Sequence, residues 1–366
     1  MSSVDQQRIR RTRTGLIAHD PARALAGYTL FTPMFGDGTV YLVDMDGAIA
    51  HTWRLPHRPG LYGYLLDDGH LFYCGKVEDG VKRFAAWDRF KAGAALEVDW
   101  HGKVVWEVRH PDHHHDARKL RNGNVILLCL RPLPPALQAR VRGGLAGTES
   151  DGTIYADYLV EVTTRGEVVW EWRSWEHLDF ETELITPQDH REEWTHGNTV
   201  AELPDGNLVV SFRNISTVVI VDRRTGAIVW KLGAPPLAQQ HDPRPLSNGH
   251  LLIFDNGAHR RDHPAPYSRV IEVDPGTKTI VWEYQDQSLF DFFSPYISGA
   301  QRLANGNTLI CEGCDGRIFE VTPDGQVVWE YVSPHFFVES GRPGLNNWVF
   351  RAFRYTPEDI ERARRA

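Results

Sequence analysis

The sequence has little cysteine, no excess of positive charge and no long apolar run. Four cysteines in 366 residues are too few for a disulfide scaffold, so we expect structural thiols. The net charge of -8 disfavours nucleic acid or an anionic membrane as the main partner. No stretch approaches the ~20 consecutive apolar residues of a membrane helix, and no apolar segment follows the N-terminal arginines. These absences predict a cytoplasmic protein whose partner is a small molecule.

Two short cassettes recur along the chain. The first is a turn followed by an apolar strand with tryptophan, in six copies: DGAIAHTW, HGKVVWEV, RGEVVWEW, TGAIVWKL, GTKTIVWEY and DGQVVWEY. The second is an Asp-Gly or Asn-Gly turn before another apolar strand, as in LLDDGHLFYC, KLRNGNVILLC, ELPDGNLVVSF, PLSNGHLLIF and RLANGNTLIC. These dipeptides favour type I′ hairpins, in which both central residues have positive φ. Each repeat unit therefore contains two hairpins.

A period of roughly 50 to 60 residues with short alternating strands predicts an all-β, six-bladed β-propeller, with room for one degenerate extra blade. We expect the propeller to span 27–355, after a partly disordered arm at 1–26. Residues 356–366 read as a helix capped by Thr356. The last strand, NNWVFRAFRY, is expected to close the ring with GYTLFTPM near the N-terminus, which removes an exposed sheet edge.

Three segments interrupt the repeat: 131–157, 173–195 and 285–297. Long loops on a rigid scaffold form the walls of pockets. The last segment contains LFDFFSPYISG, which we interpret as a cap over an aromatic ligand. Its candidate substrate-binding side chains are Phe290, Phe292, Phe293 and Tyr296.

Histidines fall at equivalent places in successive repeats. Eight residues before the turn glycine stand His115, Asn198 and His241, and His196 precedes Asn198 by two positions. The loops that enter the innermost strands of a propeller converge at one end of its channel. We therefore predict that these four side chains meet in space.

Arg213 joins the predicted cluster because it ends a channel-facing strand, where a buried arginine needs an anionic partner. Two other repeats carry Leu61 and Ser298 at the histidine position, so these two blades contribute uncharged side chains to the predicted channel mouth. His113 and His114 are read as loop groups, or as groups behind the site.

The segments HHHDARKLRNGN, WTHGNTVAELPDGNLVVSFRN and QHDPRPLSNGHLLIFDNG resemble the bacterial arylsulfotransferase family over roughly residues 95 to 335. Its members are β-propeller enzymes that move a sulfuryl group between phenols without a nucleotide donor. The resemblance implies that His241 is the nucleophile that becomes sulfated and that Arg213 binds the sulfuryl group. It also implies that His115 and His196 are partner histidines in catalysis and that Asn198 lies beside the substrate. No cofactor is then required.

Two other functions fit the same residues. His115, His196 and His241 are also a possible three-histidine site for iron, copper or zinc, serving an oxygenase, lyase or hydrolase that acts on an aromatic or apolar molecule. Asp116 and Asp242 would then orient the imidazole rings. Arg213 disfavours a nearby metal unless an anionic substrate lies between them. A third reading is a propeller that serves as a non-enzymatic interaction platform.

Overall fold

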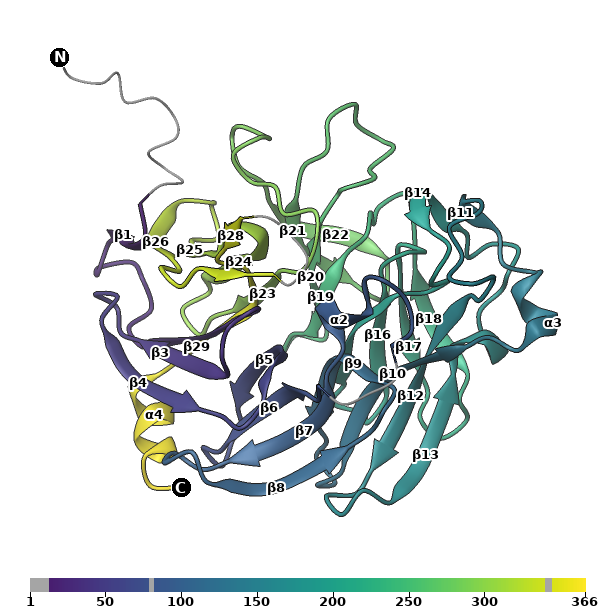
Figure 1. Cartoon of the computed structure of the whole chain (residues 1–366). Coiled ribbons are helices and arrows are strands. Elements are labelled where there is room, and N and C mark those ends of the chain that lie inside the picture. The colour runs from purple at the N-terminus through teal and green to yellow at the C-terminus, as the bar shows by residue number, and fades with distance from the viewer. Residues whose placement is uncertain (1–12, 79–81, 340–343) are drawn as a thin grey trace.

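The computed structural model describes residues 13–78, 82–339 and 344–366, and in it six antiparallel blades surround a central axis (Figure 1). The strands of each blade are given from inner to outer. Blade one contains β29 (Val349–Tyr355), β2 (Tyr28–Pro33), β3 (Thr39–Val43) and β4 (Ile49–Arg54). Blade two contains β5 (Arg58–Leu65), β6 (Leu71–Lys76), β7 (Gly93–Val98) and β8 (Val104–Arg109), and blade three contains β9 (His113–Lys119), β10 (Val125–Pro132), β12 (Tyr155–Val162) and β13 (Val168–Arg173).

The remaining blades follow the same order along the chain. They are β15 (Gly197–Glu202), β16 (Leu208–Phe212), β17 (Thr217–Val221) and β18 (Ile228–Leu232); β19 (His241–Pro245), β20 (Leu251–Asp255), β21 (Arg269–Asp274) and β22 (Thr279–Tyr284); and β23 (Gly299–Arg302), β24 (Thr308–Glu312), β25 (Arg317–Val321) and β26 (Val327–Val332). The six-bladed prediction is therefore confirmed.

Both ends of the chain join the ring. The last strand, β29, pairs with β2 from Tyr28↔Tyr355 to Pro33↔Val349, so the predicted closure is confirmed. The expected N-terminal arm is partly wrong, because β1 (Gly15–His19) pairs with β26 as a fifth strand of the last blade. Residues 1–12 of that arm lie outside the described residues.

The turn glycines have the conformation that only glycine adopts cheaply. Gly123 has φ +86° and donates its N–H to Leu120 O at 2.9 Å, and the other four copies are alike. The residue before each glycine is not left-handed, so the expected type I′ geometry is wrong. Asn124 pairs back with Leu120, which makes this a longer turn ending in a left-handed glycine.

Tryptophans on outer strands attach one blade to the next. The indole N–H donates to a backbone carbonyl of the following blade in Trp53, Trp172, Trp230, Trp282 and Trp329. The apolar core lies between the blades, where β-branched and aromatic side chains of adjacent sheets pack together. The repeated cassette thus supplies both an edge strand and an attachment between blades.

The insertions collect mainly at one side of the propeller. They contain α2 (Trp87–Phe90), α3 (Pro135–Gln138), the 3-10 helices Ser174–Glu176 and Gly313–Asp315, the parallel pair β11 (Gly143–Leu145) and β14 (Ile185–His190), and the hairpin β27 (Phe337–Val338) and β28 (Leu345–Asn346). Figure 1 shows two green loops, after β20 and after β22, standing out at the top of the view.

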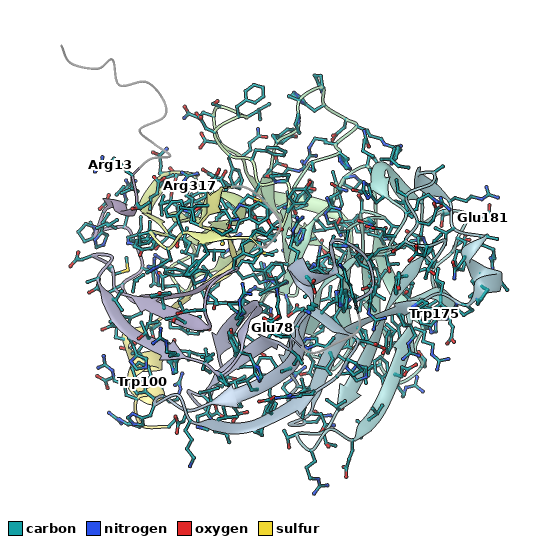
Figure 2. All side chains as sticks on the ribbon, in the orientation of Figure 1. Arg13, Glu78, Trp100, Trp175, Glu181 and Arg317 are labelled. Carbon is teal, nitrogen blue, oxygen red and sulfur yellow. The ribbon has the colours of Figure 1, made fainter. Side chains whose placement is uncertain are left out.

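The C-terminal helix α4 (Pro357–Ala363) begins as predicted, with Thr356 and Asp359 forming a capping box. It packs at the bottom of the view near Trp100, over whose ring Arg364 lies at 5.7 Å (Figure 2). Within the described ranges, no helix has the length and apolar character needed to cross a membrane.

Candidate active site

A cavity of about 340 Å³ lies at the end of the channel where the inner strands begin. His115 is near the start of β9, His196 directly precedes β15 and His241 is the first residue of β19. These three side chains and Arg213 all line the cavity. Of the side chains that the turn-glycine alignment predicts to meet, the three histidines line this cavity and Asn198 does not, while Arg213, added for its place at the end of a strand, does.

Asn256 determines which nitrogen of His241 carries the proton. Its amide group donates to the carbonyls of Ser294 and Ile297, at 2.8 and 2.9 Å, so its oxygen is the atom directed at the ring. That oxygen lies 2.7 Å from His241 Nδ1 and can only accept, so Nδ1 carries the hydrogen. The lone pair of neutral His241 is therefore on Nε2, in a ring that lines the cavity.

The other two histidines are held in the same way, by Nδ1. His196 Nδ1 donates to Glu193 Oε2 at 2.7 Å. His115 Nδ1 is 2.7 Å from Nδ1 of His114, which is itself fully buried. All three rings use Nδ1 for protein contacts, which leaves their Nε2 atoms for a ligand.

Burial keeps two of the three rings neutral. Loss of solvent is the largest cause that holds the pKa of His241 well below its ordinary value, and it outweighs the opposite effect of the Asn256 hydrogen bond. Burial also holds the pKa of His115 well below its ordinary value, helped by His196 and His114. A neutral imidazole retains the lone pair that a nucleophile or base requires.

Arg213 has the anionic partner that the sequence predicts for it. It is buried just after β16, and its guanidinium is 3.3 Å from Asp189 Oδ1 and 3.0 Å from Gln239 Oε1. The Arg213 charge, opposing the effect of burial, lowers the pKa of Asp189. The Nε atom of Arg213 has no partner among the described residues, and the side chain lines the cavity.

Aromatic rings form part of the wall. Phe90 in α2 stacks on His115 at 4.5 Å between ring centroids and meets the His196 ring edge-on at 5.0 Å. Tyr296 lies against Arg213 at 5.1 Å, and Trp348 also lines the cavity. The cavity thus combines flat apolar walls with imidazole nitrogens and a guanidinium.

The expected aromatic cap is present only through Tyr296. Phe292 is completely buried between Phe254, Tyr284 and Phe319, so it belongs to the core. Phe290 is 71% exposed and Phe293 half-buried, and neither lines the cavity.

Asn198, expected beside the substrate, is not exposed to the cavity. It is fully buried, donates to Gln240 O at 2.8 Å and does not line the cavity. His113 and His114 are not in a loop, because both belong to β9.

Asp116 and Asp242 do not orient the histidines. Both carboxylates contact Arg351, at 3.0 and 3.1 Å, and Asp116 also accepts from the hydroxyl of Tyr62. Arg351 also donates to Thr199 Oγ1 at 2.7 Å. These residues lie on inner strands, so the aspartates serve a buried ion network that ties the blades together.

The three histidines do not form a ready metal site. Nitrogens bound to one ion at ~2.0–2.1 Å lie within about 4.2 Å of one another. Among described residues, the only His, Cys, Asp or Glu set with ligand atoms within 4.8 Å of each other is Asp68, His70 and Glu97. In that set, Lys119 Nζ already lies 2.9 Å from Glu97. The geometry gives the metal alternative no support.

Asn256, Glu193 and Phe90 belong to the site but were not predicted from the sequence. Asn256 and Arg213 both follow their turn glycine by seven positions, so the alignment that found His241 contains the signal for Asn256 as well. Glu193 and Phe90 come from insertions outside the repeat, where no equivalent position exists for comparison.

Fold and site together define a β-propeller with a histidine-lined cavity at one mouth of its channel. A family model described as Arylsulfotransferase (ASST) matches residues 36–326. The chain belongs to this family, which confirms the resemblance.

Individual relatives are more distant. The chain is 38% identical over 91 residues to the arylsulfate sulfotransferase AssT of Escherichia coli O6:H1, a match covering 22% of this chain and 15% of AssT. A Bacteroides caccae protein of unknown function has a similar structure, with a TM-score of 0.54, 14% identity and coverage of 90% of this chain and 98% of that one. The WD40 β-propeller domain of Doa1 aligns at a TM-score of 0.47 and 12% identity, over 94% of this chain and 95% of that one.

Proposed function

We propose that this protein transfers a sulfuryl group from an aryl sulfate to a phenol through a sulfated His241. Family membership and a relative named for that activity support the reaction class. The observation that carries the mechanism is the Asn256 contact, since it leaves the lone pair of neutral His241 on Nε2.

In the first half-reaction, Nε2 of His241 attacks sulfur, the N–S bond forms and the S–O bond to the phenol breaks. Arg213 offers a planar cation to the sulfuryl oxygens, and its unpartnered Nε is consistent with such a ligand. A second phenol then takes the sulfuryl group from His241. One proton donor or acceptor in the cavity serves both steps, and such a group contributes about 10²- to 10⁴-fold.

The aryl parts of donor and acceptor suit the wall formed by Phe90, Tyr296 and Trp348. Stacking of an aromatic ring against such side chains contributes roughly 0.5–1.5 kcal/mol in addition to the contribution of the buried apolar area. No metal or organic cofactor enters this scheme.

The test is turnover of 4-nitrophenyl sulfate with phenol as acceptor, followed by release of 4-nitrophenol. We expect wild-type protein to be active and His241→Asn to lose activity by at least about 10³-fold, because the nucleophile is gone. His113→Leu is the matched control, since His113 is an equally buried histidine that does not line the cavity. Equal rates for wild type and His241→Asn would reject the proposal.

A further inference from the structure

We propose that His114 and Asp157 form a buried proton relay behind His115, so that His115 exchanges protons with the phenol while remaining neutral. This inference rests on the proposed sulfuryl transfer and adds two positioning residues to it. Neither residue lines the cavity, so both act through His115.

Three buried side chains form a continuous chain of contacts. His115 Nδ1 is 2.7 Å from His114 Nδ1, and His114 Nε2 is 2.9 Å from Asp157 Oδ1. All three residues are at most 4% exposed. Water is therefore kept from each contact, which strengthens the electrostatic coupling between them.

The Asp157 carboxylate is held in place by Thr195, just before β15, and by Gly197, the first residue of β15. Its Oδ2 accepts from the backbone N–H of Gly197 at 2.7 Å and from the hydroxyl of Thr195. A Cβ at Gly197 would lie 2.9 Å from Oδ1 and Cγ of Asp157, so only glycine permits this approach. With Oδ2 committed, Oδ1 is the oxygen directed at His114.

The contacts of His114 and His115 limit which of their ring nitrogens carry hydrogens. His114 Nε2 and Asp157 Oδ1 lie at an ion-pair distance of 2.9 Å without hydrogen-bond geometry. Because a carboxylate cannot donate, the relay requires a hydrogen on His114 Nε2. The two facing Nδ1 atoms then share one hydrogen between them. If it lies on His115, both rings are neutral and His115 presents a lone pair at Nε2. If it lies on His114, that ring is an imidazolium paired with Asp157, and neutral His115 presents an N–H at Nε2.

The two states match the two halves of the reaction. When a phenol takes the sulfuryl group, its O–S bond forms, the N–S bond breaks and the electron pair returns to Nε2 of His241. The phenol proton moves to Nε2 of His115, and the Nδ1 proton of His115 moves to His114. With an aryl sulfate donor every movement reverses, and the departing phenolate receives its proton from His115.

His115 and His114 have different surroundings. Burial lowers the pKa of His115 most, and His196, His114, His241 and Arg351, which all face it, lower it further. His114 contacts the Asp157 carboxylate, and its other neighbours are the rings of Trp87 and Phe90, at 5.9 and 6.1 Å. The relay therefore places the positive charge on His114, which contacts the Asp157 carboxylate.

The test compares two donors in His114→Asn. Asparagine keeps a polar atom near the position of Nδ1 and can still hold His115, but it cannot carry the proton. We expect kcat/KM for 4-methylphenyl sulfate, whose phenolate needs a proton, to fall by about 100-fold or more. For 4-nitrophenyl sulfate, whose leaving group is stable as the anion, the fall should be smaller by about tenfold or more. Asp157→Asn should likewise lower kcat/KM more for 4-methylphenyl sulfate than for 4-nitrophenyl sulfate.

His113→Leu is the control for altered packing in β9. Both ring nitrogens of His113 lack partners among the described residues, so it should leave the ratio between the two donors unchanged. An equal loss for both donors in His114→Asn, or no loss for either, would overturn the relay.

A second measurement separates the relay from the proposed reaction. In wild-type protein with ¹⁵N-labelled histidine, NMR should show one hydrogen shared by the Nδ1 atoms of His114 and His115, and a hydrogen on Nε2 of His114. Two Nδ1 atoms that share no hydrogen would contradict the relay. If wild-type protein turns over neither sulfate while the shared hydrogen is present, the proposed reaction fails and the proton arrangement stands.

Discussion

At the scale of single residues, the site is built by controlling imidazole nitrogens. His115, His196 and His241 each use Nδ1 for a protein contact, to a histidine, a carboxylate and an amide. Each contact fixes the ring orientation, and the carboxylate and the amide oxygen also fix the proton on Nδ1 of His196 and His241. Repeat alignment predicts the histidines but not the partners contributed by insertions, since Glu193 has no counterpart in the other repeats.

The His241 contact predicts the effect of changing Asn256. Asn256→Leu removes the acceptor for Nδ1–H, so Nε2 is no longer the preferred site of the lone pair. We expect kcat/KM for aryl sulfate turnover to fall by about 10- to 100-fold, as for other groups that orient a reactive histidine. An unchanged kcat/KM in a correctly folded Asn256→Leu variant would show that the amide does not set the state of His241.

Buried histidines also predict how stability depends on pH. Burial lowers the pKa of His113 to about 3, against about 6.5 in an unfolded chain. Between these values the unfolded state binds more protons, so the free energy of unfolding falls as pH drops below 6.5. One such group contributes up to about 1.4 kcal/mol per pH unit.

His113→Leu should therefore make this pH dependence shallower by up to that amount. Urea unfolding at pH 6.5 and pH 5 measures the difference. Identical falls for wild type and variant would mean that His113 takes up protons in the folded protein.

At the scale of elements, the repeat predicts strands well and insertions poorly. Strand pairing repeats the same apolar pattern in every blade, and closing the ring then required the last strand, NNWVFRAFRY, to pair near the N-terminus, as β29 does with β2. The segment 285–297 has no such pattern, and its aromatic residues divide between core, surface and cavity. Only Tyr296 of the predicted cap reaches the cavity, because a loop's side chains point where local turns direct them.

This division predicts different effects for two neighbouring phenylalanines. Phe292→Ala should destabilise the protein by about 3–5 kcal/mol, because it leaves a cavity among three aromatic rings. Phe290→Ala should change stability by no more than about 0.5 kcal/mol, since that ring is 71% exposed. Urea unfolding measures both, and similar values would contradict the assigned positions.

At the scale of the whole molecule, the ring is held together at its axis as well as at its edge. Arg351 of the closing strand contacts Asp116 of β9 and Asp242 of β19, so one guanidinium joins three blades. Asp116 and Asp242 stand at equivalent repeat positions, seven residues before their turn glycines. Arg351 lies outside the two cassettes, 235 and 109 positions away, so the repeat alignment does not reveal the contact.

Arg351→Met should therefore be strongly destabilising. It removes the fully buried cation that contacts both carboxylates and leaves the more distant Arg118 near Asp116, while Asp242 keeps Arg244 at 3.0 Å. Breaking a buried ion pair costs about 3–5 kcal/mol. Arg365→Met is the matched control, since Arg365 pairs with Glu361 at the surface, where an ion pair contributes about 0–1 kcal/mol. A small effect of Arg351→Met on the free energy of unfolding would show that the aspartates find other partners.

The central claim is that His241 carries the sulfuryl group between the two phenols. It is tested most directly by mixing the protein with excess 4-nitrophenyl sulfate and no acceptor, quenching rapidly and locating the modified residue by mass spectrometry. The account predicts one sulfuryl group per chain, on His241, lost again when phenol is added. Release of 4-nitrophenol without modification of His241, or modification that phenol does not remove, would contradict it.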